Sequence, residues 1–242
     1  NNGRGGVGVA HGATITGLDY LNDLQHAYNW TTQTTSALYD AAMRWAGRFG
    51  IMSNSWGTTP DFSDPLNLNS LGNSSEVDSG HFAWVSVNGR DGLGTIVVKA
   101  AWNETMNANG DGSNVSRHSI TVAATERNGF AADYSNYGSA ILLTAPAASV
   151  TTDLIGQQGY NRSGTTDGDP LARTDYTSTF SGTSAATPLV SGVVALMLDA
   201  NDRLGWRDVH DILALSASHT GSAMGSGPSA TEVGTWLTMG GN

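Results

Sequence analysis

The stretch Phe180-Ser181-Gly182-Thr183-Ser184-Ala185-Ala186-Thr187-Pro188 decides the fold of this chain, because it places a serine where an extended segment turns into a helix. Ser184 follows a glycine turn and precedes an apolar segment, residues 189–198, that predicts a buried helix. A hydroxyl in the first turn of a helix lies at the positive end of the helix dipole, among backbone N–H groups without intrahelical partners. Such groups can stabilise an oxyanion, so Ser184 is a candidate nucleophile. A serine that only caps the helix is the alternative interpretation.

Composition narrows the class of protein. With 242 residues the chain can bury a large core, and a single domain is expected. It has no cysteine, which excludes disulfides and cysteine-based metal or redox chemistry. The formal net charge of −10 argues against a nucleic-acid partner. Its apolar runs fall short of the roughly 20 residues that cross a bilayer, so we expect no membrane span.

The order of apolar segments indicates an α/β fold. Buried strands that alternate with helices predict a mostly parallel central sheet between two helical layers, a three-layer α/β/α architecture. The expected strands are residues 13–17, 50–57, 94–101, 119–124 and 139–145, and the expected helices are residues 35–48, 81–88, 189–198 and 206–215. Residues 58–80 and 156–178 are polar and are expected to form surface insertions.

The motif Gly182-Thr183-Ser184-Ala185-Ala186-Thr187-Pro188 resembles the nucleophile motif of subtilisin-like serine proteases, the subtilases. Further segments of the chain resemble segments of this family and occur in the same order as in the family. Two of them are similar to its kexin/furin-like branch. The segments are residues 1–10, 53–57, 100–103, 151–153 and 198–209, the last two being the kexin-like ones. The resemblance implies a subtilisin-like fold, a serine endopeptidase with a polypeptide substrate, and a secreted or extracytoplasmic location.

The resemblance also implies roles for residues before the serine. Asn103 matches the asparagine whose side-chain amide donates to the oxyanion. The backbone of two segments would hold an extended peptide as an added strand: Ser55, Trp56 and Gly57, and Ala100, Ala101 and Trp102. Alternatively, these residues are plain sheet core. The family usually has glycine where this chain has Trp102, so we expect a narrowed or reshaped specificity pocket. Asp111 resembles an acidic residue that gives furin-like enzymes a basic preference, although Asn-Gly-Asp-Gly is also a natural turn.

A serine hydroxyl needs an adjacent base that a carboxylate orients. Subtilases carry Asp and His motifs before the serine, and neither motif occurs here. The segment from His11 to Gly17 mimics the histidine motif, but it reads as a strand and no carboxylate precedes it. We therefore expect residues 1–242 to be a single, partial catalytic domain. The missing N-terminal segment of the parent protein would supply Asp and His, and a short C-terminal end would also be absent. The chain alone would be nearly inactive. The alternative is a catalytically inactive protease-fold module used for binding or structure.

A structural Ca²⁺ site is a further implication of the resemblance. The side-chain oxygen of Asn2 and the backbone carbonyls of Arg4 and Gly6 match part of a subtilase calcium loop, and oxygen ligands suit this hard cation. A glycine-rich turn explains the same residues equally well. The sequence Asn107-x-Asn109-x-Asp111-Gly112 has the start of an EF-hand loop but lacks its flanking helices.

Overall fold

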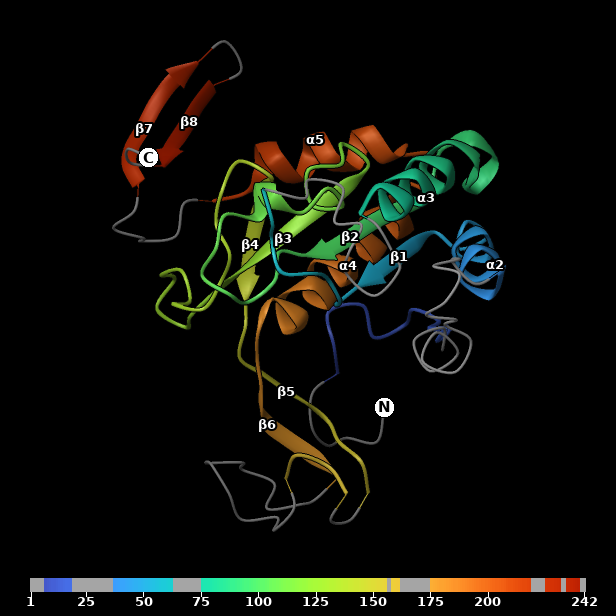
Figure 1. Ribbon diagram of the computed structural model, residues 1–242, viewed down its shortest axis with the longest axis horizontal. Coiled ribbons are helices and arrows are strands. Elements are labelled where there is room, and N and C mark those ends of the chain that lie inside the picture. The colour runs from blue at the N-terminus through green and yellow to red at the C-terminus, as the bar shows by residue number, and fades with distance from the viewer. Residues whose placement is uncertain are drawn as a thin grey trace.

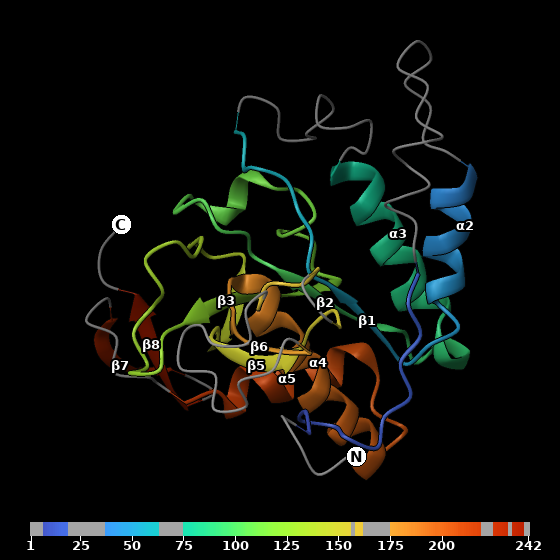
Figure 2. The ribbon, with the colours of Figure 1, turned by 90° about the horizontal axis from the view of Figure 1, so that it is seen from below.

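The computed structural model describes residues 7–18, 37–62, 75–155, 158–161, 175–218, 225–231 and 234–239. Four strands form a parallel sheet in the order β1-β2-β3-β4 (Figure 1). These strands are β1 (Ile51–Asn54), β2 (Ile96–Ala100), β3 (Ser119–Thr125) and β4 (Ile141–Pro146). Helices α4 (Thr183–Ala200) and α5 (Trp206–Ser216) lie on one face, and α2 (Ala37–Ala46) and α3 (Ser75–Asn88) lie on the other (Figure 2). The predicted α/β/α fold with a parallel sheet is confirmed.

The alternation of side chains along β2 explains why both faces need helices. Val98 packs in a core cluster with residues of α4 and α5, including Val194 and Val209. Its neighbour Val97 packs in a second cluster with Met43 of α2 and Phe82 of α3. A parallel strand that is buried on both faces reads as a continuous β-branched run, which is the pattern the sequence shows here.

Two antiparallel hairpins complete the described structure. β5 (Ser149–Thr152) pairs with β6 (Tyr176–Phe180), which leads into the start of α4. β7 (Gly225–Thr231) pairs with β8 (Gly234–Met239) in a hairpin that lies away from the sheet (Figure 1). The last hairpin was not predicted, because the glycine- and serine-rich β7 has little strand propensity. Two short 3₁₀ helices, η1 (Arg90–Gly92) and η2 (Ala108–Gly110), lie in loops.

Four expectations about elements were wrong. Residues 13–17 form no strand, and Ile15 there is 90% exposed. Helix α3 begins at Ser75, inside the predicted polar insertion, and β6 begins at Tyr176, inside the second one. Helix α4 is not buried throughout, since Val193 and Leu196 are 41% and 48% exposed.

Helix α4 is also the one described helix whose length and composition would allow it to cross a membrane. This is weak evidence for a span, because the core helix of a globular protein meets the same criteria. Here α4 contacts all four strands of the sheet.

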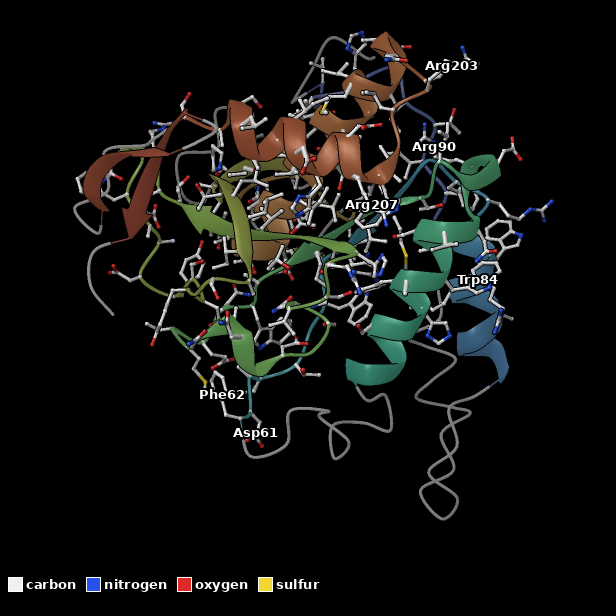
Figure 3. All side chains as sticks on the ribbon, turned by 90° about the horizontal axis from the view of Figure 1, so that it is seen from above. Asp61, Phe62, Trp84, Arg90, Arg203 and Arg207 are labelled. Atoms are coloured by element: carbon white, nitrogen blue, oxygen red, sulfur yellow. The ribbon has the colours of Figure 1, made fainter. Side chains whose placement is uncertain are left out.

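Arg90 links the loop after α3 to the loop before α5 through hydrogen bonds. Its guanidinium donates to the backbone carbonyls of Gly94 at 3.2 Å, Leu204 at 2.8 Å and Asp202 at 2.7 Å. Figure 3 shows Arg90 beside the turn that carries Arg203. The end of α3 is thereby joined to the loop that starts α5.

Candidate active site

Ser184 lies in the first turn of α4, where the chain leaves β6 through a glycine. Gly182 has φ 92° and ψ 168°, a backbone conformation that only glycine adopts readily. Thr183 is the first helical residue and Ser184 the second, so the N–H of Ser184 has no intrahelical acceptor. Within the described residues nothing else accepts from it. The half-buried Ser184 therefore presents a hydroxyl and a backbone donor at the same helix end.

A proline inside α4 links the serine to the loop after β1. Pro188 has no N–H, so the carbonyl of Ser184, four residues earlier, lacks its usual helical donor. The hydroxyl of Ser55 donates to this carbonyl at 2.9 Å, and the hydroxyl of Ser184 donates in return to the carbonyl of Ser55 at 3.3 Å. The two serines hold the loop that follows β1 against the start of the helix.

Asn103 lies on the other side of the helix start, and its amide orientation is fixed by Thr183. Its Oδ1 accepts from the backbone N–H of Thr183 at 2.8 Å and from the Thr183 hydroxyl at 3.1 Å. A Cβ on Gly182 would lie 3.3 Å from Oδ1 and 3.5 Å from Nδ2 of Asn103. Since Oδ1 is held, Nδ2 is the free end of the amide, and it has no acceptor in the described part of the chain. The site thus offers two donors, Asn103 Nδ2 and Ser184 N–H.

The two segments with a predicted substrate-binding role leave neighbouring strands at the same edge of the sheet. Ser55, Trp56 and Gly57 follow β1, while Ala100 ends β2 and Ala101 and Trp102 follow it. Their backbone groups differ in availability. Ala101 donates to Val122 at 3.0 Å, and Trp102 donates to the Thr183 hydroxyl at 3.1 Å and accepts from Asn136 at 3.0 Å.

Gly57 in the first segment keeps its backbone groups available. Its N–H and C=O have no partner among the described residues, so an added strand could pair there.

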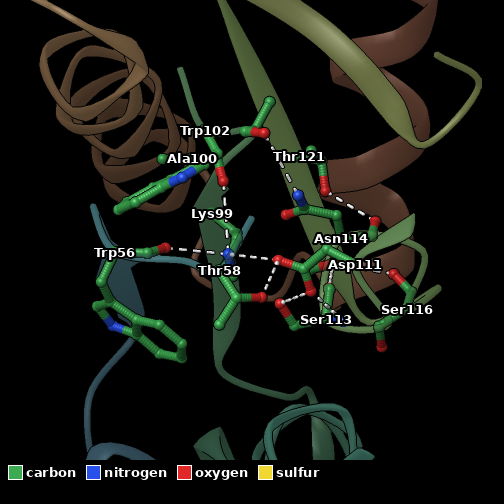
Figure 4. Close-up of polar contacts among 12 residues, drawn as sticks. Trp56, Thr58, Lys99, Ala100, Trp102, Asp111, Ser113, Asn114, Ser116 and Thr121 are labelled. Atoms are coloured by element: carbon green, nitrogen blue, oxygen red, sulfur yellow. Dashed lines mark hydrogen bonds and ion pairs between the residues drawn. The ribbon is translucent and has the colours of Figure 1, made fainter. Parts of the chain in front are cut away.

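Asp111 is buried and does not reach the surface. Its carboxylate is 1% exposed, accepts from the N–H and hydroxyl of Ser113 at 2.8 and 2.6 Å, and lies 3.8 Å from Lys99 Nζ. Lys99 is fully buried and also donates to the carbonyls of Trp56 at 3.0 Å and Ala100 at 3.4 Å (Figure 4). Lys99 was not predicted as a site residue from the sequence, although one signal was present: it is the only lysine of the chain and stands within a β-branched run.

The described residues show no imidazole and no metal ligands at the site. The hydroxyl of Ser184 has no hydrogen bond to a histidine there, and no group of three or more His, Cys, Asp or Glu side chains could hold a metal. His118 packs on Trp206 with ring centroids 4.8 Å apart, and burial, followed by Arg117 and Arg207, lowers its pKa.

The predicted calcium residues Asn2, Arg4 and Gly6 lie outside the described residues. The EF-hand-like oxygens are committed to internal donors: Oδ1 of Asn107 accepts from the Asn109 N–H, and Oδ1 of Asn109 accepts from the Ala140 N–H.

A serine at a helix start, with a backbone N–H and a side-chain amide beside it, matches the part of a serine hydrolase site that carries the nucleophile and the oxyanion donors. The chain belongs to the subtilase family, whose sequence profile matches residues 1–234. It is 30% identical over 236 residues to the calcium-dependent protease of Trichormus variabilis, covering 89% of this chain and 33% of that protein. It is also 30% identical over 247 residues to human furin, covering 99% of this chain and 26% of furin. The predicted family, with furin-like relatives, is confirmed.

Solved structures agree with the fold. The chain is similar to the serine protease of Aeromonas sobria with a TM-score of 0.61 and 28% identity, over 78% of this chain and 38% of that one. A cold-adapted subtilisin-like serine proteinase aligns with a TM-score of 0.52 at 23% identity, over 78% of this chain and 57% of that one. The subtilisin-like fold is therefore confirmed. The chain spans about a quarter to a third of the length of the curated relatives described above.

Proposed function

We propose that Ser184 is the nucleophile of a serine endopeptidase. Its Oγ attacks the carbonyl carbon of a peptide bond, and the oxygen that becomes negative is stabilised by Asn103 Nδ2 and the Ser184 N–H. The observation that carries this proposal is the pair of hydrogen bonds from Thr183 to Asn103 Oδ1, at 2.8 and 3.1 Å, which leave the NH₂ end of the amide available. A donor that is already oriented needs no reorganisation as the oxyanion forms, which is the basis of this kind of catalysis.

The base and its orienting carboxylate come, in this proposal, from a His and an Asp outside the 242 residues. The hydroxyl of Ser184 now donates to the Ser55 carbonyl at 3.3 Å, a long bond that a nearby imidazole would replace. The imidazole would take the Ser184 proton during attack and return it to the leaving amine. Residues 1–242 would accordingly act as one partial catalytic domain, nearly inactive alone.

The substrate is an extended polypeptide. It would lie along Ser55 to Gly57 and pair with the free N–H and C=O of Gly57 as an added strand. This places the attacked carbonyl next to Ser184, because Ser55 is hydrogen-bonded to Ser184 in both directions.

A structural Ca²⁺ and an extracytoplasmic location complete the proposal. Relatives named calcium-dependent protease support the cation, for which Asn2 would supply a side-chain oxygen and Arg4 and Gly6 backbone carbonyls. A relative from Aeromonas sobria, named as an extracellular serine protease, supports the location.

The test compares the natural protein that contains this sequence, made with all the residues its gene encodes, with its Ser184→Ala variant on a fluorogenic peptide. We expect Ser184→Ala to lower kcat by about 10⁶-fold, a magnitude known from subtilisin of the same family. Ser191→Ala is the matched control, because Ser191 lies two turns further along α4 and its hydroxyl bonds to Ser53 and Thr187 rather than to Ser184 within the described residues. Unchanged hydrolysis in Ser184→Ala would refute the proposal. Peptide binding without hydrolysis by the wild type would establish the non-catalytic module instead.

A further inference from the structure

The space between the segments after β1 and β2 is filled from within the chain. Gly57 has no side chain, and a Cβ there would lie 3.1 Å from Lys99 Nζ and 3.3 Å from a ring carbon of Trp102. The indole of Trp102 thus crosses from the second segment to the first. In open α/β sheets, ligands bind at this carboxyl edge, between the loops that leave adjacent strands.

The conformation of Trp102 is unfavourable in two ways. Its φ of 80° lies in the left-handed region, which is sterically poor for a tryptophan. Its indole N–H is buried and finds no hydrogen-bond partner in the described part of the chain. The backbone is nevertheless held firmly, since Trp102 donates to Thr183 and accepts from Asn136. Unfavourable geometry that the surroundings enforce is typical of residues that shape a functional site.

The position of Trp102 in the sequence predicts which residue of a bound peptide it would contact. Trp102 directly precedes Asn103, so a peptide oxygen near Asn103 Nδ2 places its own residue beside the indole. When the peptide pairs with Gly57, the side chain of that residue points between the two segments, into the space that the indole occupies.

We propose that Trp102 determines specificity by closing this space, so that the residue whose carbonyl is attacked must be glycine or alanine. The inference rests on the proposed endopeptidase function. Lys99 Nζ and the indole border the same space at Gly57, and Asp111, 3.8 Å from Nζ, balances the charge of Lys99. The closed pocket therefore has no net charge with which to select a basic or acidic residue. The basic preference implied by the resemblance of Asp111 to furin-like enzymes is therefore not expected.

The experiment measures kcat/KM on peptides that differ only in the residue before the cleaved bond: Gly, Ala, Leu, Phe, Arg and Glu. The complete natural protein, Trp102→Gly, Trp102→Phe and Ser184→Ala are compared. We expect the wild type to favour Gly and Ala, and Trp102→Gly to raise the Phe-to-Ala ratio by about 10- to 100-fold, as an opened apolar pocket would. Trp102→Phe, which keeps an aromatic ring in place, should retain the wild-type preference.

Trp84→Ala is the matched control for loss of a tryptophan. Trp84 lies on α3, 37% exposed, under the guanidinium of Arg44, and Figure 3 shows it on the outer surface. It should keep the wild-type preference. Efficient wild-type cleavage after Phe or Leu would overturn the inference, as would an unchanged Phe-to-Ala ratio in an active Trp102→Gly protein. If Trp102→Gly does not fold, the kcat/KM values of the wild type on the six peptides test the inference by themselves. If the wild type shows no hydrolysis that depends on Ser184, the proposed function is wrong, and this inference falls with it.

Discussion

Replacing Lys99 with methionine should lower the free energy of unfolding by about 3–5 kcal/mol, the usual effect of removing one partner of a buried ion pair. Methionine is close to lysine in length, so the main loss is the charge. Lys99 and Asp111 are 0% and 1% exposed, with Nζ and Oδ2 3.8 Å apart. At this distance an effective dielectric constant of about 20 gives an attraction of about 4 kcal/mol.

The structure places this variant toward the lower end of the range. The Asp111 carboxylate would keep two donors from Ser113, at 2.8 and 2.6 Å, and a third from Thr58 at 3.4 Å. These donors solvate the remaining negative charge in part. The melting temperature should still fall by about 6–12 °C, because about 1 kcal/mol corresponds to roughly 2–4 °C in a domain of this size.

The assay is urea unfolding followed by circular dichroism, for the wild type, Lys99→Met, Asp111→Asn and the double variant. Removing both charges leaves neither one buried alone, so the double variant should be more stable than the two single effects predict by at least about 1.5 kcal/mol. Arg127→Met, an exposed cation, is the control and should change stability by less than about 0.5 kcal/mol. Single effects that simply add in the double variant would refute the view that these side chains form a coupled buried pair.

Three further predictions concern the oxyanion donor, a loop connection and pH. Asn103→Ala should lower kcat of the complete protein by about 10²–10³-fold with little change in KM, a magnitude taken from subtilisin itself; steady-state kinetics measures it, and an unchanged kcat contradicts the assigned donor. Arg90→Ala removes three hydrogen bonds to carbonyls and should destabilise the protein by about 1.5–3 kcal/mol in urea unfolding. Burial lowers the pKa of His118 in the folded state, so its contribution to stability is complete above the unfolded pKa of about 6.5 and is lost as the pH falls through the folded pKa. Urea midpoints at pH 7.5 and pH 5 should therefore differ less in His118→Gln than in the wild type, and equal differences would contradict this assignment.

The parallel sheet could be predicted because its strands are buried on both faces. Residues 94–101 and 119–124 are nearly continuous apolar or β-branched runs, and the structure has β2 and β3 there. The same propensity misled at residues 13–17, where Thr14, Ile15 and Thr16 have strand-forming side chains but pair with no described strand. Strand propensity reflects packing against neighbours, which a local sequence does not show.

The site was predictable in its motif but not in its contacts. Ser184 and Asn103 followed from the resemblance, and the structure brings them to the same helix start through Thr183. The burial of Asp111 could not be predicted, because it depends on Lys99, twelve residues earlier on another element. The sequence Asn-Gly-Asp-Gly is typical of an exposed turn. Only the three-dimensional fold brings the Lys99 ammonium group next to its aspartate.

Thr183 joins the two parts of the site that the proposals treat separately. Its hydroxyl accepts from the Trp102 N–H at 3.1 Å and donates to Asn103 Oδ1 at 3.1 Å, while the residue is fully buried. One side chain therefore fixes both the backbone of Trp102, the proposed specificity residue, and the amide of Asn103, the proposed oxyanion donor. Because these contacts are made within the described chain, the oxyanion donors are positioned without the base. In the proposed mechanism the site is thus preorganised for the negative charge, and a bound His would add the transfer of the Ser184 proton to the leaving amine.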